Sequence, residues 1–228
     1  MLITRPLQDS RWAPLAAFVA RWYREPLAWP RGPRLERVDA QIAQVEHRLG
    51  SKLPQGIREW FALAGHRLAD VNQDRPVRLE GLEVEDGRLP VWWENQGNWS
   101  VDIELTGNEP RAVVVSDEPN WNRRATTTQA LRGMVVSDTL AGADRGVGPL
   151  GALRPEVVGG YLEDPPPDLE ARLEALPALD VFINPYFEAP MRGHEALVVR
   201  AHPGAGCDWM AATPEALAQA RALLSLQQ

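Results

Sequence analysis

The sequence predicts an α+β fold in which helices pack against a mainly antiparallel or mixed sheet. Through the first 65 residues, apolar side chains recur every three or four positions, which is the spacing of one helix face. Between residues 77 and 116 the spacing changes to alternation, which indicates strands with one buried face. Helical spacing returns after Thr128 and again after Thr213, so helices are expected both before and after the sheet.

Three helices are expected before the sheet. Ser10 can cap the first, which covers about residues 10–24. The second covers about residues 35–49, and a glycine follows it in the position of a left-handed helix cap. The third covers about residues 54–65, with a proline at its start and a glycine at its end. The proline-rich segment 25–33 is expected to link the first two helices without regular structure.

An antiparallel meander of about four strands is expected over residues 77–116. The first strand covers residues 77–84 with a kink or bulge at Gly81, and residues 85–88 supply a hairpin turn to a return strand at 89–94. The third strand, residues 99–105, alternates strictly, so its polar side chains are expected to face solvent: Ser100, Asp102 and Glu104. A short apolar strand over residues 112–116 completes the meander.

The second half of the chain carries weaker signals. Thr128 can cap a helix that ends near Leu140, and the last helix is expected to have Thr213 as its cap and Pro214 in its first turn. Residues 141–167 are rich in glycine and proline and are expected to be mainly loop. Four segments could form strands and one a short helix: strands at 157–162, 179–183, 196–201 and 207–211, and a helix at 169–176.

The charge distribution favours a basic partner. The formal net charge is -7 at pH 7, which argues against nucleic acid as a direct ligand, because phosphate binding needs clustered positive charge. Residues 80–118 are the most acidic segment, with Arg88 and Arg111 set against ten acids: Glu80, Glu83, Glu85, Asp86, Glu94, Asp102, Glu104, Glu109, Asp117 and Glu118. Such a run is either a solvated sheet face or a patch that steers a partner.

A cytoplasmic location is expected. No apolar run approaches the roughly 18 residues that a membrane helix requires, and the N-terminus lacks the apolar core of a signal peptide. The single cysteine, Cys207, excludes an internal disulfide and agrees with a reducing compartment.

No catalytic constellation is evident, so we expect a protein that is not an enzyme and that carries no cofactor or metal. The chain has neither a phosphate-binding loop nor a dinucleotide fingerprint. His194, His202, Cys207 and Asp208 lie close together in sequence, but their spacing matches no compact zinc motif. We interpret the histidines as residues of polar loops and the cysteine as a small buried side chain.

The most distinctive stretch, residues 92–99, has the sequence W-W-E-N-Q-G-N-W. Tryptophan buries a large apolar surface yet needs a partner for its indole N–H, and primary amides need several hydrogen bonds when they are desolvated. The stretch can therefore be a hydrogen-bonded hairpin corner. It can also be a recognition surface, because tryptophan is enriched among residues that dominate binding energy.

Two segments together resemble the SUKH superfamily, which includes the Smi/Knr-like proteins. Residues 42–65, I-A-Q-V-E-H-R-L-G-S-K-L-P-Q-G-I-R-E-W-F-A-L-A-G, resemble its helix, LG..LP turn and second helix, and residues 94–99 resemble its E-N-Q-G-x-W hairpin. Trp121 lies where that pattern has a tryptophan. The resemblance implies one α+β domain over residues 1–228, with a core at 35–140, an N-terminal helix at 10–24 and a C-terminal extension at 141–228. Asn98 replaces the small or apolar residue that usually follows the glycine.

The resemblance also implies a function. Bacterial members of the superfamily look like immunity proteins that bind and neutralise a cognate toxin, in many cases a nuclease, so the partner expected here is a basic protein toxin. Two alternatives remain open: a glycan-binding or cell-wall-associated protein, and an adaptor that loads an effector for secretion. The candidate binding residues are Trp92, Trp93, Glu94, Asn95, Gln96, Asn98, Trp99, Asp117, Glu118 and Trp121. Within this set we expect Glu94, Asn95 and Gln96 to hold the hairpin through backbone hydrogen bonds, which leaves Trp92, Asn98 and the acidic flanks as contact residues.

Overall fold

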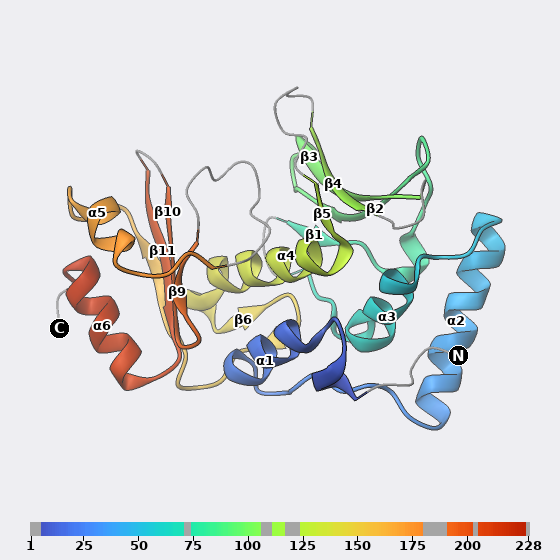
Figure 1. Cartoon of the computed structure of the whole chain (residues 1–228), viewed down its shortest axis with the longest axis horizontal. Helices are drawn as coiled ribbons and strands as arrows, with labels where there is room; N and C mark the ends of the chain where they lie inside the picture. Colours follow the sequence, from blue (N-terminus) through green and yellow to red (C-terminus); the bar gives the residue numbers. More distant parts are fainter. Residues whose placement is uncertain are drawn as a thin grey trace.

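The fold is α+β, and every strand pairing among the described residues is antiparallel (Figure 1). A computed structural model describes residues 6–70, 74–105, 111–116, 124–179, 191–202 and 205–226. These residues form a five-stranded sheet of order β1-β2-β3-β4-β5, a four-stranded sheet of order β8-β11-β10-β9 and a two-stranded sheet of β6 and β7.

The helices before the first sheet match the predicted segments, with one shift. They are η1 (Leu7–Asp9), α1 (Ala13–Trp22), α2 (Pro33–Leu49), α3 (Gln55–Leu63) and η2 (Gly65–Arg67). As predicted, α2 ends at a glycine in the left-handed conformation, Gly50 with a φ of 67°. Helix α1 begins at Ala13, three residues after Ser10. The predicted capping bond is nevertheless present in the turn before the helix, where the Ser10 hydroxyl oxygen accepts from the Trp12 backbone N–H at 3.2 Å.

The turn between α2 and α3 is organised by a buried carboxylate. Glu46 of α2 is 4% exposed and accepts hydrogen bonds from the Lys52 ammonium at 2.7 Å and the Leu53 backbone N–H at 3.0 Å. The Arg58 guanidinium of α3 lies 3.5 Å from the same carboxylate. Burial raises the pKa of Glu46, but these three groups outweigh burial, and the pKa is lowered overall.

The first sheet consists of β1 (Arg75–Pro76), β2 (Arg88–Trp93), β3 (Trp99–Glu104), β4 (Arg111–Ser116) and β5 (Arg124–Thr126). The predicted strand at residues 77–84 is wrong. In this segment the strand is limited to β1, whose residues 75–76 pair with β2. The 3-10 helix η3 (Leu79–Gly81) follows, closed by a hydrogen bond from the Gly81 N–H to the Arg78 carbonyl oxygen at 2.9 Å. The spacing of Leu79 and Leu82 therefore reflects a tight helical turn.

Strand β3 is buried on both faces, which also differs from the prediction. Ser100 and Asp102 are 5% and 6% exposed. These two side chains are buried because β3 is the central strand, where bulky neighbours on β2 and β4 flank them. The Ser100 hydroxyl donates a hydrogen bond to Asp102 at 2.7 Å, and burial raises the pKa of Asp102.

Helix α4 (Thr127–Ala141) lies between the two large sheets (Figure 1). Its cap is Thr126, two residues before the predicted Thr128. The Thr126 side chain and the Gln129 side chain each bond the other's backbone in a capping box. Residues 133–140 are all buried, so this helix has no solvent-facing side over its C-terminal half.

The C-terminal half contains more strand than its loop-like composition indicated. Its elements are η4 (Ala143–Arg145), β6 (Val147–Gly148), β7 (Gly151–Ala152), β8 (Val158–Leu162), α5 (Leu169–Glu174), β9 (Arg192–His194), β10 (Leu197–His202), β11 (Gly206–Ala211) and α6 (Pro214–Leu224). The predicted strands near 157–162, 196–201 and 207–211 and the Thr213 cap are confirmed. The strand predicted at 179–183 lies almost wholly outside the described residues.

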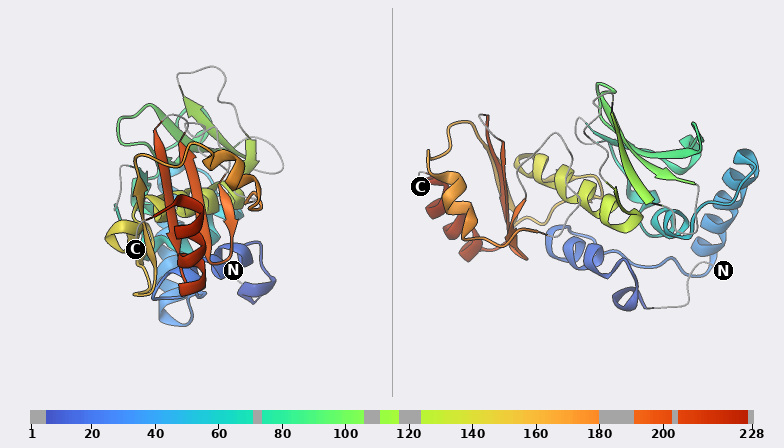
Figure 2. Two further views of the ribbon diagram at one scale, coloured as in Figure 1. Left: turned by 90° about the vertical axis from the view of Figure 1, so that its left-hand side faces the viewer. Right: turned by 45° about the horizontal axis from the view of Figure 1, so that its top comes forward.

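The four-stranded sheet is covered on both faces (Figure 2). Helices α5 and α6 pack on one face around residues such as Leu197 and Val199, while Val198 and Met210 turn to the opposite face and join the larger core that includes α4. The larger core draws side chains from Trp12 through Ala212, so the first helix and the C-terminal sheet share it.

We predict that Glu46→Gln lowers the free energy of unfolding by about 1–3 kcal/mol at pH 7, because a charged acceptor of two hydrogen bonds, which also forms an ion pair with Arg58, is lost. The folded pKa of Glu46 is lowered, so its stabilisation is present above the pKa of an unfolded glutamate and is lost as the pH falls. Urea denaturation at several pH values measures this. Glu36→Gln, at an exposed position of α2, should change stability by only a few tenths of a kcal/mol. Equal losses in the two variants, or a loss at position 46 that persists at acid pH, would contradict the prediction.

Candidate functional site

The hairpin between β2 and β3 is shaped by Glu94. Its carboxylate accepts hydrogen bonds from the backbone N–H groups of Gln96 at 3.0 Å and Asn98 at 3.1 Å. Gly97 takes a φ of 78°, and its N–H donates to the Glu94 carbonyl oxygen at 3.1 Å. Glu94 therefore fixes the turn through backbone hydrogen bonds, as the sequence predicted.

The other predicted binding residues divide between core and surface. Asn95, Gln96 and Asn98 are exposed, and the Asn98 amide donates to the Gln96 amide oxygen at 3.3 Å. Trp93 is half-buried on the outer face of the sheet. Three predicted residues lie outside the described residues: Asp117, Glu118 and Trp121.

Trp92 and Trp99 are core residues, so the expectation that Trp92 contacts a partner is not met. Their exposed fractions are 0% and 3%. The reason is the alternation of side chains along β2, which sends Trp92 toward the helices and Trp93 to the other face. The Trp92 ring lies 6.5 Å from Trp60 of α3, which in turn stacks on Trp12 at 5.8 Å.

An acidic segment precedes β2, and we define it as Glu80, Glu83, Glu85 and Asp86. All four side chains are exposed, and no cation of the described residues lies within ion-pair distance of them. Asp86 and Gly87 have φ values of 47° and 75°, the geometry of a two-residue hairpin turn. The predicted turn is confirmed by the two backbone hydrogen bonds that join Glu85 and Arg88, at 2.9 and 2.8 Å.

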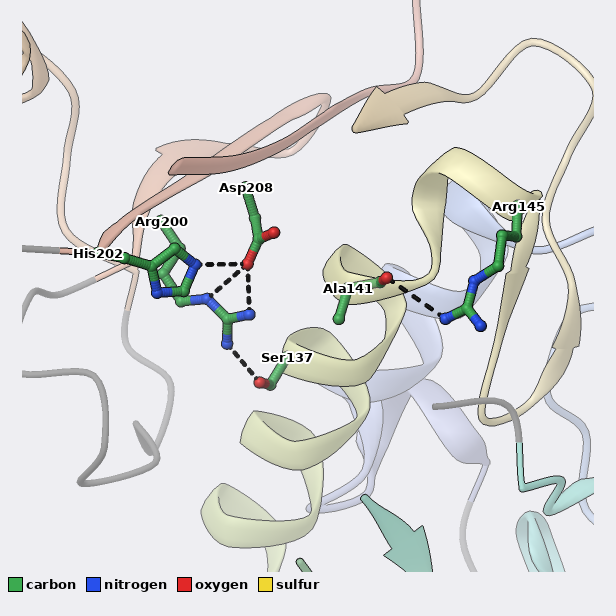
Figure 3. Close-up of polar contacts among 6 residues, drawn as sticks. All are labelled: Ser137, Ala141, Arg145, Arg200, His202 and Asp208. Atoms are coloured by element: carbon green, nitrogen blue, oxygen red, sulfur yellow. Dashed lines mark hydrogen bonds and ion pairs between the residues drawn. The ribbon is translucent and has the colours of Figure 1, made fainter. Parts of the chain in front are cut away.

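A second polar group lies buried between α4 and the four-stranded sheet (Figure 3). Arg200 of β10 is 3% exposed and donates from Nε to Asp208 of β11 at 3.1 Å. Its other guanidinium arm donates to the Ser137 hydroxyl of α4 at 2.6 Å. The His202 Nε2 lies 2.8 Å from the same Asp208 oxygen. On the far side of α4, Arg145 donates to the Ala141 carbonyl oxygen at 3.5 Å.

Two further carboxyl groups interact electrostatically with Arg200 and have raised pKa values. Asp138 of α4 is 2% exposed, and its pKa is raised well above the usual value by burial and by the charge of Asp74. Burial, and then the charge of Glu94, raises the pKa of Asp74 to about 6. The Arg200 guanidinium lowers the pKa of both groups. Glu94 thus connects the exposed hairpin electrostatically to the buried cluster. We call Asp74, Glu94, Asp138 and Arg200 the carboxylate cluster.

The side chains described around Arg200 and Asp208 do not include an activated nucleophile. The Ser137 hydroxyl is bound by an arginine, which cannot act as the general base that a nucleophilic serine needs. Burial and then the charge of Asp208 raise the pKa of the Cys207 thiol to about 11, so it stays protonated at neutral pH. Within the described part of the chain, no three His, Cys, Asp or Glu side chains lie close enough together to hold a metal ion.

The interpretation of the C-terminal histidines needs correction. Cys207 is buried as expected, but His202 ends strand β10 and is bound to Asp208, and His194 lies in β9 with its Nε2 2.9 Å from the Gln219 amide oxygen. Sequence reasoning missed Arg200, Ser137, Asp138 and Asp74. Only Arg200 carries a local signal, because an arginine in the middle of an apolar strand needs a buried counter-charge.

Comparison with known proteins gave no match to a family model, to a curated protein or to a solved structure. The SUKH resemblance therefore stays a prediction. None of the helices formed by the described residues is long and apolar enough to cross a membrane.

We predict that Asp74→Asn makes the protein more stable above about pH 7. The pKa of Asp74 is about 6 in the folded protein, against 3.8 for an aspartate in water, so the folded state binds this proton more tightly. The corresponding stabilisation is present below about pH 4 and is lost as the pH rises through about 6. Because water still reaches part of the side chain, we expect a gain of about 1–2 kcal/mol at pH 8 and almost none at pH 3.5.

Denaturation at a series of pH values measures this difference, with Asp70→Asn as the control at an exposed aspartate nearby in sequence. Glu94→Gln should lower the pKa of Asp74, because a like charge is removed. A stability difference between the Asp74→Asn variant and the native protein that does not change with pH would contradict the assignment.

Proposed function

We propose that the protein is a non-catalytic immunity protein that binds a basic toxin and neutralises it stoichiometrically. The observation that carries this proposal is the acidic segment, in which four exposed carboxylates, two of them in the hairpin turn before β2, lack cations from the described residues. Carboxylates in that state attract a positively charged partner without first having to break ion pairs of their own. The sequence resemblance to the SUKH superfamily supports the same function.

The proposed interface runs along β2, between the turns at its two ends. The acidic segment lies at the start of β2 and the hairpin of residues 94–98 at its end, about 20 Å apart for a six-residue strand. An interface of ordinary size covers that span. It would join the exposed amides of Asn95, Gln96 and Asn98 to the acidic segment, with half-buried Trp93 between them.

The described tryptophans give the glycan-binding alternative no support. Sugar platforms need an exposed ring face, whereas six of the eight described tryptophans are buried and Trp29 and Trp93 are only partly exposed. The effector-loading alternative uses the same surface as the immunity function. The two differ in outcome, because an adaptor binds the toxin and leaves it active.

We predict that the double charge reversal Glu83→Lys and Glu85→Lys slows association with the toxin encoded by the adjacent gene by about tenfold at low salt, and less at high salt. Surface plasmon resonance with the purified pair measures the rate, and co-expression measures protection of cells. The matched control is Glu170→Lys with Glu174→Lys, which changes the net charge equally at two exposed positions of α5.

Each result separates the hypotheses. Equal slowing in both double variants would show that only net charge matters, and the acidic segment would lose its role. Tight binding to a toxin that stays fully active would replace the immunity function by the adaptor function. If the protein binds no toxin encoded by a neighbouring gene, the proposal is wrong.

A further inference from the structure

Strand β8 stands out as the one long unprotected sheet edge among the described strands. The first sheet ends in β1 and β5, which have two and three residues, and β1 contains a proline. In the four-stranded sheet, β9 has three residues and is covered by the preceding segment, through hydrogen bonds from the Leu179 N–H to Met191 and from the Gly193 N–H to Pro177, both at 2.9 Å. Short, proline-containing or covered edges are how proteins prevent unwanted strand pairing.

No such protection is found on β8. It has five residues, and all five pair with β11 without a register shift. No backbone hydrogen bond joins it to any other described segment. On the side away from β11, a row of backbone N–H and C=O groups therefore has no partner strand among the described residues.

The side chains of β8 also suit a partner. Val158 and Tyr161 are 42% and 55% exposed and are two of the three large apolar side chains exposed in the described part of the chain. Gly159 is required by internal packing, because a Cβ there would lie 2.5 Å from the Ala143 Cβ. Gly160 has no such requirement, since a Cβ at that position would lie 3.9 Å from its nearest neighbour. A strand glycine that the protein's own packing does not require leaves space for another backbone to approach.

The charges next to β8 identify the kind of partner. Glu163 and Asp164 follow the strand directly, are exposed, and have no cation of the described residues within ion-pair distance. A second copy of β8 paired antiparallel about Gly160 would place Asp164 opposite Glu156, whose charge Arg154 already pairs at 2.7 Å. A second copy would therefore bring no unpaired cation to Glu163 and Asp164, whereas an extended segment that carries lysine or arginine would.

We propose that β8 is a docking site for an extended, basic segment of a partner protein, which adds to the four-stranded sheet as a fifth strand beside residues 158–162. Main-chain hydrogen bonds supply the pairing, Val158 and Tyr161 contact side chains on opposite faces of the added strand, and Glu163 and Asp164 select for positive charge. This site is separate from the proposed toxin-binding face, because the sheet of β9, β10 and β11 lies at the opposite end of the molecule from β2 (Figure 1). It does not depend on the immunity function.

The test uses a seven-residue peptide in which lysine and valine alternate and which carries fluorescein at its N-terminus. Fluorescence anisotropy measures its affinity for the full chain, and amide hydrogen exchange followed by NMR locates it. We expect the peptide to slow exchange at residues 158–162 and not at residues 80–86. A peptide with proline in place of the central valine should bind about tenfold more weakly, because proline removes a hydrogen-bond donor and disfavours strand pairing.

Three variants complete the test. Val158→Lys should weaken binding about tenfold by placing a positive charge on the edge. Val84→Lys, at the third exposed apolar side chain, is the matched control and should leave the affinity within about twofold. The pair Glu163→Gln and Asp164→Asn tests charge selection at exposed positions outside the strand, where folding is not at risk, and should weaken binding.

Three outcomes would overturn the proposal. The first is equal affinity for the proline peptide, which would show charge attraction without strand pairing. The second is protection of the acidic segment together with equal effects of Val158→Lys and Val84→Lys. The third is concentration-dependent dimerisation with protection of β8, which would make a second copy of the chain the occupant.

Discussion

The structure depends most on the burial of helix α4 from every side. Because residues 133–140 are all buried, each polar side chain in that half of the helix needs a partner from another element. Thr139 lies 2.5 Å from the Tyr23 hydroxyl, directly after α1, and Ser137 accepts from Arg200 of β10. A buried polar group left without its partner costs about 1–3 kcal/mol. These pairings therefore specify how the first helix and the C-terminal sheet dock on the same central helix, and the apolar core alone would be less selective between alternative dockings.

The carboxylate cluster makes the surface and the interior electrostatically dependent on each other. Glu94 shapes the exposed hairpin with its carboxylate, and the same charge raises the pKa of Asp74. A cationic group of a partner near Glu94 would lower the pKa of Asp74 and release a proton at mildly acidic pH. Partner binding at the hairpin and protonation of Asp74 would then be linked equilibria, each of which shifts the other by the same free energy.

The parts of the fold that could be predicted from sequence are those with local causes. Gly50 ends a helix and Thr213 begins one, each through contacts within a few residues, and both positions were predicted. The burial of Asp102 depends on β3 being the central strand, which alternation cannot reveal. Arg200 was overlooked although its partner lies eight residues away on the next strand. Asp74 joins the carboxylate cluster only because segments distant in sequence pack together, so no sequence pattern could place it there. For the candidate site, the sequence identified the Glu94 turn and an acidic run over residues 80–118, but it named the buried Trp92 as a contact residue.

The Glu46 turn has a practical consequence for chemistry done on this protein. Lys52, which bonds Glu46 at 2.7 Å, is the only lysine in the chain. Its side chain is 80% exposed and therefore accessible to reagents. Amine-reactive dyes, cross-linkers and activated surfaces will consequently modify, apart from the N-terminal amine, a single side chain that neutralises a buried carboxylate. Acylation would remove that positive charge, so labelling through lysine would report on a weakened α2–α3 turn, and attachment through an engineered exposed cysteine would leave the turn intact.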